Sequence, residues 1–341
     1  MTAAATVAVE TAPAKNTHPL ARLAARRVLE GALTLFALSI LVFLATSVLP
    51  GDAASAVLGK QATGPALKAM RHAMGLDRSL IVQYEHWLFG LLHGDLGYTA
   101  LGYGTGGHVT VWSQISDKLS NSLALAGTAF VPIVILSQLL GVFSALKAGR
   151  WQDQLISVVT LVPAALPEFV LGTVLLSVLF TWLDLLPPVS FVLPGTNPFS
   201  AGITLILPVL TLVGVTLGPA VRMLRAGMLD ALEADTVAVA RLNGLSEWRV
   251  VRRYALRNAL APTIQVFALI AQYLVGGLLI VENLFGYPGI GTELVNAVTI
   301  HDNLEVQSVT MLLAAFYVAV TIVADLLVMI LVPQLRTAAS R

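Results

Sequence analysis

Six long apolar stretches, separated by polar segments, set the pattern of this chain. An α-helix needs about 20 mostly apolar residues to cross a bilayer core about 30 Å thick, and each stretch has that length. The stretches are Val28–Leu49, Leu119–Leu146, Leu155–Leu186, Ala201–Val221, Ala259–Val281 and Val309–Val332. The pattern predicts an all-α polytopic membrane protein with six transmembrane helices.

The first stretch is either a transmembrane helix or the apolar part of a signal peptide. Three arginines precede it, and basic residues also precede the apolar part of a signal peptide. This stretch is longer than a typical signal sequence, and Pro50-Gly51-Asp52 is not a small-residue cleavage site. We therefore predict an uncleaved first helix within residues 21–49. Residues 1–20 have no apolar period, which is typical of a disordered tail.

The polar segments define the expected domain organisation. Residues 50–118 form a long insertion between the first two helices. Residues 119–335 form a core with five transmembrane helices and a polar loop over 227–258, and residues 336–341 form a short tail.

The distribution of lysine and arginine predicts the orientation of the chain. Fifteen of the 20 basic residues lie in the two tails and in the segments after the second and fourth stretches. The loops over 184–200 and 282–308 have none. Because basic residues concentrate in cytoplasmic loops, we expect both termini and loop 227–258 in the cytoplasm, and the insertion outside.

The amino-acid composition excludes several classes of protein and of site. Hydrophobic residues make up 57% of the chain and charged residues only 11%, against about 25% in soluble domains. The absence of cysteine excludes disulfides and cysteine-based metal sites. A net charge of +1 gives no sign of a nucleic-acid partner, and the arginines of loop 227–258 are better explained as topology determinants.

Loop 227–258 contains the most specific motif. Its sequence resembles the coupling loop of bacterial ABC-importer permeases, in the variant of the first permease subunit of dipeptide and oligopeptide importers. The matching residues are Asp235, Ala240, Arg241, Gly244, Leu245, Ala255, Leu256, Arg257, Asn258, Ala259 and Pro262.

Four further motifs extend this resemblance along nearly the whole chain. They are Pro50-Gly51-Asp52, the run from Gly75 to Gly97, Val281–Gly291, and the C-terminal Asp325-Leu326-Leu327 with Pro333–Arg336. Two external segments depart from the family pattern, Tyr98–Gly107 and His301–Ser308. These departures concern the substrate, not the family.

The resemblance implies a function and a set of partners. The chain is expected to be a permease subunit in the plasma membrane of a bacterium, importing dipeptides, oligopeptides or similar polar solutes. Its expected partners are a homologous second permease, two ATP-binding subunits, an external solute-binding protein and membrane lipid. ATP and Mg²⁺ belong to the ATP-binding subunits, and this chain is expected to hold no cofactor or metal and to have no enzymatic activity.

In this family the coupling loop seats a short helix on the ATP-binding subunit. We expect that helix over Leu229–Leu242, with Gly244 as its stop. Ala240 and Gly244 are then on one side, where small residues admit a partner's backbone. A polar rim is expected around them, formed by Asp235, Arg241, Glu247 and Arg249. Leu245 matches the family and belongs to the same expected coupling site. The residues alone equally fit a solvated surface helix beside basic residues.

Residues for the translocation path are expected elsewhere. Glu282, Phe285 and Pro288 follow the fifth stretch, where a kinked turn forms either an external gate or a simple helix end. Glu168 lies inside the third stretch, where a charge is costly unless it has a function. We expect one of three roles for Glu168: it contacts a cationic group of the solute, it pairs with an arginine of a partner subunit, or it is protonated.

No catalytic arrangement is present, and no Walker-type phosphate-binding sequence occurs. Two other classes of function remain as alternatives: a stand-alone secondary transporter driven by an ion gradient, and a membrane-embedded enzyme. Secondary transporters often contain internal repeats, and no repeat is evident here. Catalytic residues for an enzyme are lacking.

Overall fold

The computed structural model describes residues 19–48, 53–59, 62–104, 109–193 and 195–331. Within these ranges the chain is helical, and the one strand-like pairing is an isolated bridge between Tyr98 and Thr110. The predicted C-terminal tail, most of the predicted N-terminal tail and the motif at 50–52 lie outside the described residues. The all-α prediction is confirmed.

Five helices are long and apolar enough to cross a membrane, and one bent pair makes a sixth span. The five are α1 (Pro19–Val48), α6 (Val111–Leu146), α9 (Ile206–Glu233), α12 (Leu256–Phe285) and α14 (Asn303–Leu331). The pair is α7 (Trp151–Ala164) and α8 (Glu168–Leu176), which a π-helical turn over Ser177–Trp182 extends. The predicted count of six therefore depends on treating the bent pair as one span.

The third predicted stretch is not one continuous helix, which corrects the prediction for Leu155–Leu186. Its two halves meet at 104°. Pro167 has extended backbone, with φ −59° and ψ 147°, and serves as the N-cap of α8. Proline has no amide hydrogen to donate and disfavours helical geometry in the residue before it, so the helix stops and restarts here.

The ends of other elements also differ from the predictions. The helix α6 begins at Val111 instead of Leu119, where the Thr110 hydroxyl accepts a hydrogen bond from the Ser113 amide over 3.1 Å. The helix α9 extends past Val221 to Glu233, after a 3₁₀ segment over Pro198–Leu205. The predicted loop 282–308 contains a further helix, α13 (Ile290–Thr299).

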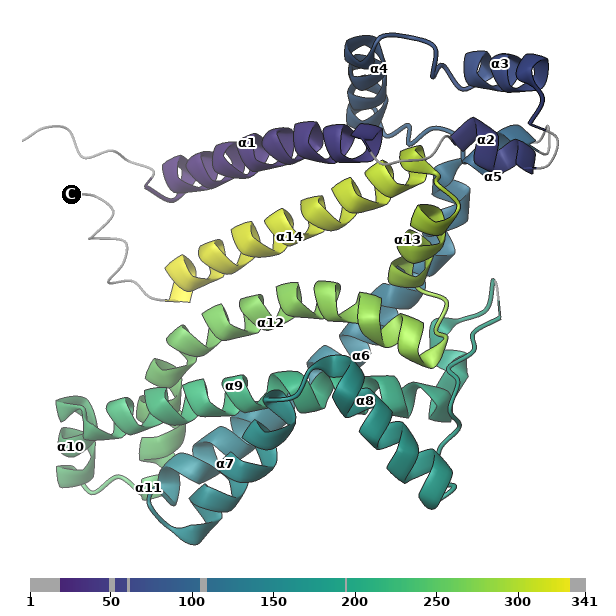
Figure 1. Cartoon of the computed structure of the whole chain (residues 1–341). Helices are drawn as coiled ribbons and strands as arrows, with labels where there is room; N and C mark the ends of the chain where they lie inside the picture. The colour runs from purple at the N-terminus through teal and green to yellow at the C-terminus, as the bar shows by residue number, and fades with distance from the viewer. Residues whose placement is uncertain (1–18, 49–52, 60–61, 105–108, 194, 332–341) are drawn as a thin grey trace, which may run out of the picture.

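The core lies around α9. Apolar side chains of α6, α9 and α12 form the largest buried cluster, which includes Leu125, Leu212 and Leu274. Close approach to α7 requires Gly218 of α9, because a Cβ atom there would lie 2.5 Å from the Thr160 carbonyl oxygen. The helices α1 and α14 form a second layer beside α12, linked by an ion pair of 3.0 Å between Arg27 and Asp325 (Figure 1).

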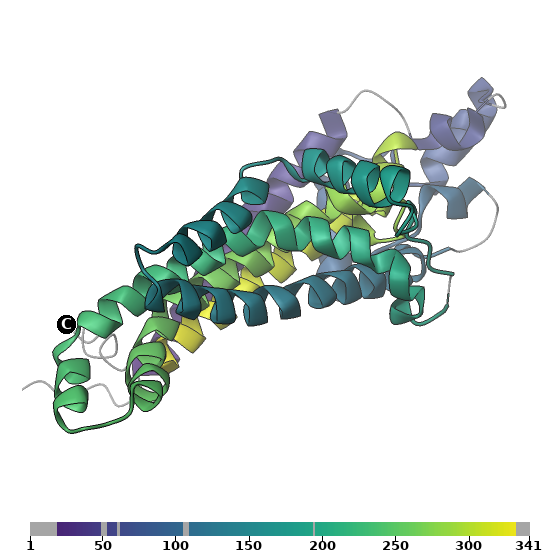
Figure 2. The ribbon, with the colours of Figure 1, turned by 90° about the horizontal axis from the view of Figure 1, so that it is seen from below.

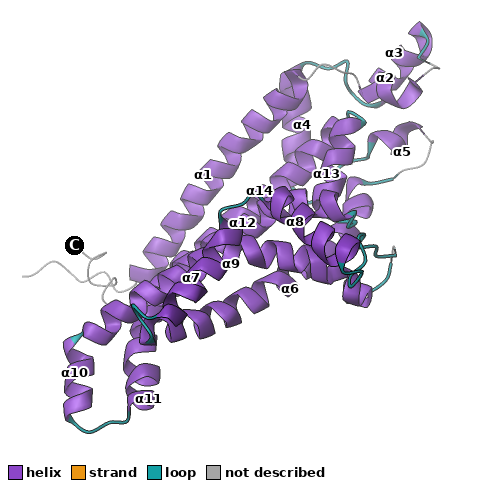
Figure 3. Cartoon of the chain, turned by 60° about the horizontal axis from the view of Figure 1, so that its bottom comes forward, coloured by secondary structure: helices purple, strands orange, loops and turns teal. Residues whose placement is uncertain are grey.

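The molecule has two distinct ends (Figure 2). At one end lie the short helices α10 (Asp235–Leu242) and α11 (Glu247–Val250), near the start of α1 and the end of α14 (Figure 3). At the other end lie the insertion helices. These are α2 (Ala53–Leu58), α3 (Gly64–Ala73), α4 (Leu80–Leu92) and α5 (Ala100–Gly104). We call these the α10 end and the insertion end.

Candidate functional site

The segment between α9 and α12 projects from the α10 end as a compact helical hairpin. Ala234 has extended backbone, with ψ 144°, so α9 ends at Glu233 and α10 starts in a new direction (Figure 3). The single helix predicted over Leu229–Leu242 is therefore wrong. After α11, a π-helical turn over Val251–Ala255 returns the chain to α12.

Gly244 ends α10, as predicted. Its φ is +72°, in the left-handed region that glycine occupies without strain. The Gly244 amide donates to the Arg241 carbonyl over 2.9 Å, and the Leu245 amide donates to the Ala240 carbonyl over 3.3 Å. These two bonds form the Schellman motif, which satisfies carbonyl groups left free at a helix end.

The inner side of α10 packs against its own chain. Val237 and Ala240 are buried in a cluster with Met228, Val250 and Ala255. The expectation that Ala240 presents a small surface to a partner is thus wrong, since Ala240 is 3% exposed and packs in this inner cluster. Gly244 lies beyond the helix in a turn, where a Cβ atom would meet nothing within 4 Å.

Three large apolar side chains of the hairpin are uncovered, among exposed polar and charged residues. Val239 is 55% exposed, Leu242 87% and Trp248 72%. Sequence reasoning did not select these three residues, although the spacing of Val239 and Leu242 already puts them on one helix side. Asp235 is exposed at the first turn of α10, and Leu245 is half-buried against the inner cluster.

A charged pair braces the hairpin. The Arg241 guanidinium donates to both carboxylate oxygens of Glu247, over 2.9 and 3.3 Å. Both side chains are exposed, so the pair contributes little to stability. Its planar two-bond geometry instead holds α11 at a set distance from α10.

The turn after α12 has the opposite character, because its polar groups are bonded inside the chain. Glu282 is fully buried and accepts hydrogen bonds from the Ser122 hydroxyl at 2.5 Å, the Gly291 amide at 2.7 Å and the Thr292 amide at 3.3 Å. The last two amides belong to the first turn of α13, where a carboxylate is favourable.

Two aromatic residues of this turn are also buried. Phe285 is 1% exposed within the main core, and the Tyr287 hydroxyl donates to the Asn121 carbonyl over 2.8 Å. The half-buried Pro288 accepts at its carbonyl from the Asn121 amide over 2.9 Å. The Glu282 and Phe285 side chains therefore point into the fold and fix α13 against α6 and α12. The gate at Glu282, Phe285 and Pro288 stays a prediction.

A buried acidic cluster lies next to this turn. Lys118 of α6 forms an ion pair with Glu293 of α13, which also accepts from Gln114 over 2.8 Å. Burial raises the pKa of Glu293, but the bonds from Lys118 and Gln114 outweigh it, and the pKa lies below its usual range. Burial also raises the pKa of Asp302, which accepts from the Ala100 and Glu305 amides.

Glu168 lies at the break between α7 and α8. Its carboxylate accepts a hydrogen bond from the Tyr273 hydroxyl of α12. Tyr273 is 40% exposed and Glu168 is half-buried. Among the described residues no lysine or arginine forms an ion pair with Glu168, so this acidic group has only a neutral partner.

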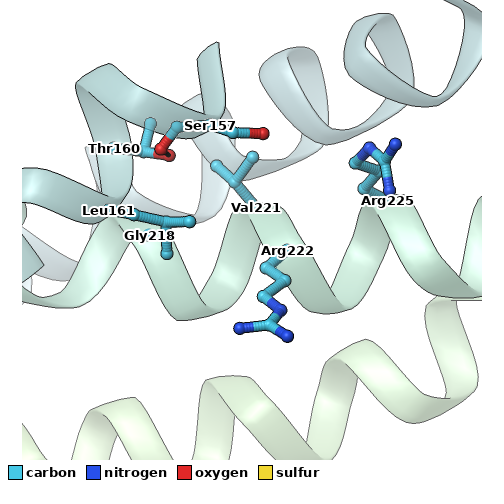
Figure 4. A pocket seen from close by; sticks show the side chains of 7 residues that line it. All are labelled: Ser157, Thr160, Leu161, Gly218, Val221, Arg222 and Arg225. Atoms are coloured by element: carbon cyan, nitrogen blue, oxygen red, sulfur yellow. Dashed lines mark hydrogen bonds between the residues drawn. The ribbon is translucent and has the colours of Figure 1, made fainter. Parts of the chain in front are cut away.

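A small cavity of about 120 Å³ lies between α7 and α9 toward the α10 end (Figure 4). Its residues are Ser157, Thr160, Leu161, Gly218, Val221, Arg222 and Arg225. Arg225 donates two bonds of 2.7 Å to Asp153, which also accepts from the Ser144 hydroxyl over 2.5 Å. The polar wall of this cavity is thus part of the joint between α6, α7 and α9.

No metal site is apparent in the described ranges, where no three histidine or acidic side chains are grouped to hold an ion. The arrangement as a whole is that of a polytopic helical core with one exposed apolar hairpin at one end and a closed, internally bonded turn near the other.

Comparison with known families identifies this class. Residues 137–337 match the binding-protein-dependent transport system inner membrane component, and residues 20–126 match the N-terminal region of such components. The chain belongs to this family, so it is a multi-pass inner membrane permease subunit of an ABC importer and not itself an enzyme.

Curated relatives cover almost the full length. The glutathione transport system permease protein GsiC of Escherichia coli O6:H1 is 32% identical over 303 residues, which are 89% of this chain and 95% of the relative. The proteins of the same name from Escherichia coli K12 and Shigella flexneri serotype 5b are each 31% identical with the same coverage. Membership in a binding-protein-dependent family argues against a stand-alone secondary transporter.

Proposed function

We propose that the hairpin of α10 and α11 transmits ATP-driven motion to this permease, and that the permease carries peptides or a glutathione-like solute into the cytoplasm. The observation that carries the first part is the exposure of three large apolar side chains in the hairpin, Val239, Leu242 and Trp248. An apolar patch rimmed by polar groups at the tip of a membrane protein is typical of a protein-binding surface.

The hairpin has the rigidity that such a transmission requires. Its inner side joins the base of α9 and the start of α12 in one apolar cluster, and its outer end is held by the Schellman motif and by the Arg241–Glu247 pair. A push on α10 is therefore passed to α9 and α12 as a rigid-body movement, which is the kind of movement that changes access in transporters.

The proposed assembly contains two permease subunits, two ATP-binding subunits that hold ATP and Mg²⁺, and an external solute-binding protein. Both termini and the α10 end are proposed to be cytoplasmic. The first support is that basic residues concentrate in the tails and in the segment from Arg222 to Arg257. The second is that this segment lies at the same end of the molecule as the start of α1 and the end of α14 (Figure 3).

The proposed substrate class is a peptide with a free amino group, which includes the γ-linked tripeptide glutathione named for the GsiC relatives. Glu168 is the proposed partner of that amino group. It is an acidic residue within the spans, it is accessible in part, and a phenol of α12 orients it. Such ionisable groups in transmembrane segments mark solute paths.

Site-specific photo-crosslinking tests the coupling surface. A benzophenone amino acid in place of Leu242 is expected to link covalently to an ATP-binding subunit in the assembled complex. The same group in place of Trp182, which is 77% exposed but lies outside the hairpin, is expected to give no such product. Equal crosslinking at both positions, or none at Leu242, would contradict the proposal.

Transport assays test the role of Glu168. In proteoliposomes with the whole complex, Glu168→Gln is expected to reduce uptake of a dipeptide while ATP hydrolysis still responds to the loaded binding protein. Uptake of the N-acetylated dipeptide, which has no ammonium group, is expected to be equal in both proteins. An equal loss for both peptides would show a structural role for Glu168 and would leave the coupling proposal intact.

A further inference from the structure

We propose that α4, within the segment between the first two spans, lies in the lipid bilayer along its plane and contacts acyl chains of the leaflet at the insertion end. The proposal concerns the surface formed by Ile81, Phe89 and Leu92. It does not depend on which solute is transported, nor on which end of the chain is cytoplasmic.

The helix α4 packs directly on two spans. The Tyr84 and Ser39 hydroxyl groups are 2.9 Å apart, and Phe43 of α1 lies against Tyr84 and Trp87, with ring centroids 5.3 and 6.0 Å apart. Met311 of α14 completes this apolar cluster. In Figure 1, α4 crosses α1 instead of continuing along it.

These contacts lie well inside the apolar spans. Nine residues separate Ser39 from Val48, where the apolar part of α1 ends, so the contact is about 14 Å from that end at 1.5 Å per residue. Met311 is eight residues into α14, or about 12 Å by the same rise. A helix held at this depth lies beside acyl chains as well as headgroups.

Three exposed apolar side chains lie along one side of α4, next to the side that packs on α1. Ile81 is 71% exposed, Phe89 66% and Leu92 75%, and their spacing puts them on one side of the helix. The span α1, on which α4 packs, also has exposed apolar residues, such as Leu41 at 62% and Leu44 at 51%. They belong to a membrane span of this family, so the exposed apolar side chains of α4 are carried by a helix that adjoins a bilayer span.

The polar residues of α4 fit an orientation along the membrane plane. The helix has no lysine or arginine, and Gln83 and His86 lie on the side opposite Ile81 and Leu92. Glu85 is the one acidic residue of α4, and its spacing puts it on the apolar side, between Leu92 and Phe89. In a helix buried about 5–10 Å into the boundary between headgroups and acyl chains, its carboxylate can still reach the headgroups.

The alternative occupant is the solute-binding protein, because both that protein and the insertion are expected outside the membrane. A water-soluble protein docks on surfaces that water reaches, and it cannot contact side chains at the depth of Ser39 and Met311 without displacing lipid. The depth of the contacts therefore favours lipid for α4, and leaves the rest of the insertion for the binding protein.

The chain has no cysteine, so single cysteines allow a direct test. Ile81→Cys and Leu92→Cys are labelled with a small environment-sensitive fluorophore in the assembled complex, in nanodiscs of phosphatidylethanolamine and phosphatidylglycerol. His86→Cys is the matched control on the polar side of α4. Quenching is then measured with a lipid carrying a nitroxide near the top of its acyl chain, and separately with iodide in the buffer.

The expected result is that the nitroxide lipid quenches the labels at 81 and 92 several-fold more than the label at 86, and that iodide shows the reverse order. Strong iodide quenching at both 81 and 92 would overturn the proposal. If added loaded binding protein then removed that iodide quenching, the surface would be a docking site for the binding protein. Because no step requires ATP or transport, the result is independent of the proposed function.

Discussion

The hairpin at the α10 end and the turn after α12 use the same kinds of residues for opposite purposes. Both contain glycines, an acidic residue and at least one aromatic residue. In the turn, Glu282, Phe285 and Tyr287 are all buried and bonded within the chain. In the hairpin, Leu242 and Trp248 are uncovered, and the acid Glu247 pairs on the surface.

The difference separates a region whose side chains stabilise the fold of this chain from a region whose side chains are left for contacts with a partner. A turn with every polar group satisfied internally stabilises the permease alone. A hairpin with uncovered apolar side chains loses nothing in the isolated chain when those side chains change, and its changes become visible only in the complex. Four substitutions test this contrast through the unfolding of the purified chain and of the complex.

The largest effect is expected for Gly289→Ala in the turn. A Cβ atom at this position would overlap the Glu282 carboxyl group, so either Glu282 or the first turn of α13 must move. Overpacking of this kind costs about 3 kcal/mol. Thermal unfolding of the purified chain measures the loss.

Gly276→Ala is the matched control on α12, since a Cβ atom there meets nothing within 4 Å. Its stability is expected to equal that of the unchanged chain or to exceed it slightly, because alanine favours helices. Similar losses for both substitutions would mean that the fit around Glu282 is not what stabilises the turn.

Lys118→Gln is expected to have the next largest effect, about 2 kcal/mol, because Glu293 keeps its buried carboxylate but loses its counter-charge. In the unchanged chain the pKa of Glu293 lies below its usual value. The ionised form of Glu293 therefore stabilises the folded chain at pH values above the pKa that Glu293 has in the unfolded chain. That stability is lost as pH falls through the pKa of Glu293 in the folded chain.

Without Lys118 the burial remains, so Glu293 is expected to take up a proton more readily. The stability deficit of Lys118→Gln should then shrink as pH falls from neutral toward about 5. Unfolding midpoints across pH check this, and a deficit that is constant with pH would contradict it.

Gly244→Ala in the hairpin is expected to cost about 1 kcal/mol, which is the strain of a left-handed backbone with a side chain. No collision adds to this cost, since the space around Gly244 is open. In the complex, stimulation of ATP hydrolysis by loaded binding protein is expected to fall. Gly127→Ala, in open space on α6, is the control and should change neither measurement.

The smallest effect on the isolated chain is expected for Val239→Thr, within about 0.5 kcal/mol, because the side chain is 55% exposed. Val237→Thr, two residues away on the buried side of α10, should cost about 2 kcal/mol from burial of a hydroxyl group. Assembly with the ATP-binding subunits should weaken for Val239→Thr. Unchanged assembly would argue against the outer side as the docking surface.

The sequence by itself determined the membrane class, the approximate positions of the spans and the stop at Gly244. Each of these follows from local chemistry: long apolar runs require lipid, and a left-handed helix end favours glycine. The motifs along the chain also indicated the family, which the comparisons confirm.

Tertiary structure decided which way side chains face. Ala240 and Glu282 looked suited to a partner and a path, but packing against Met228 and Ser122 turns them inward. The break at Pro167 and the change of direction at Ala234 likewise depend on neighbouring helices that hold each new direction. Burial is a property of the whole packed chain, and no single segment of the sequence specifies which of its sides will be covered.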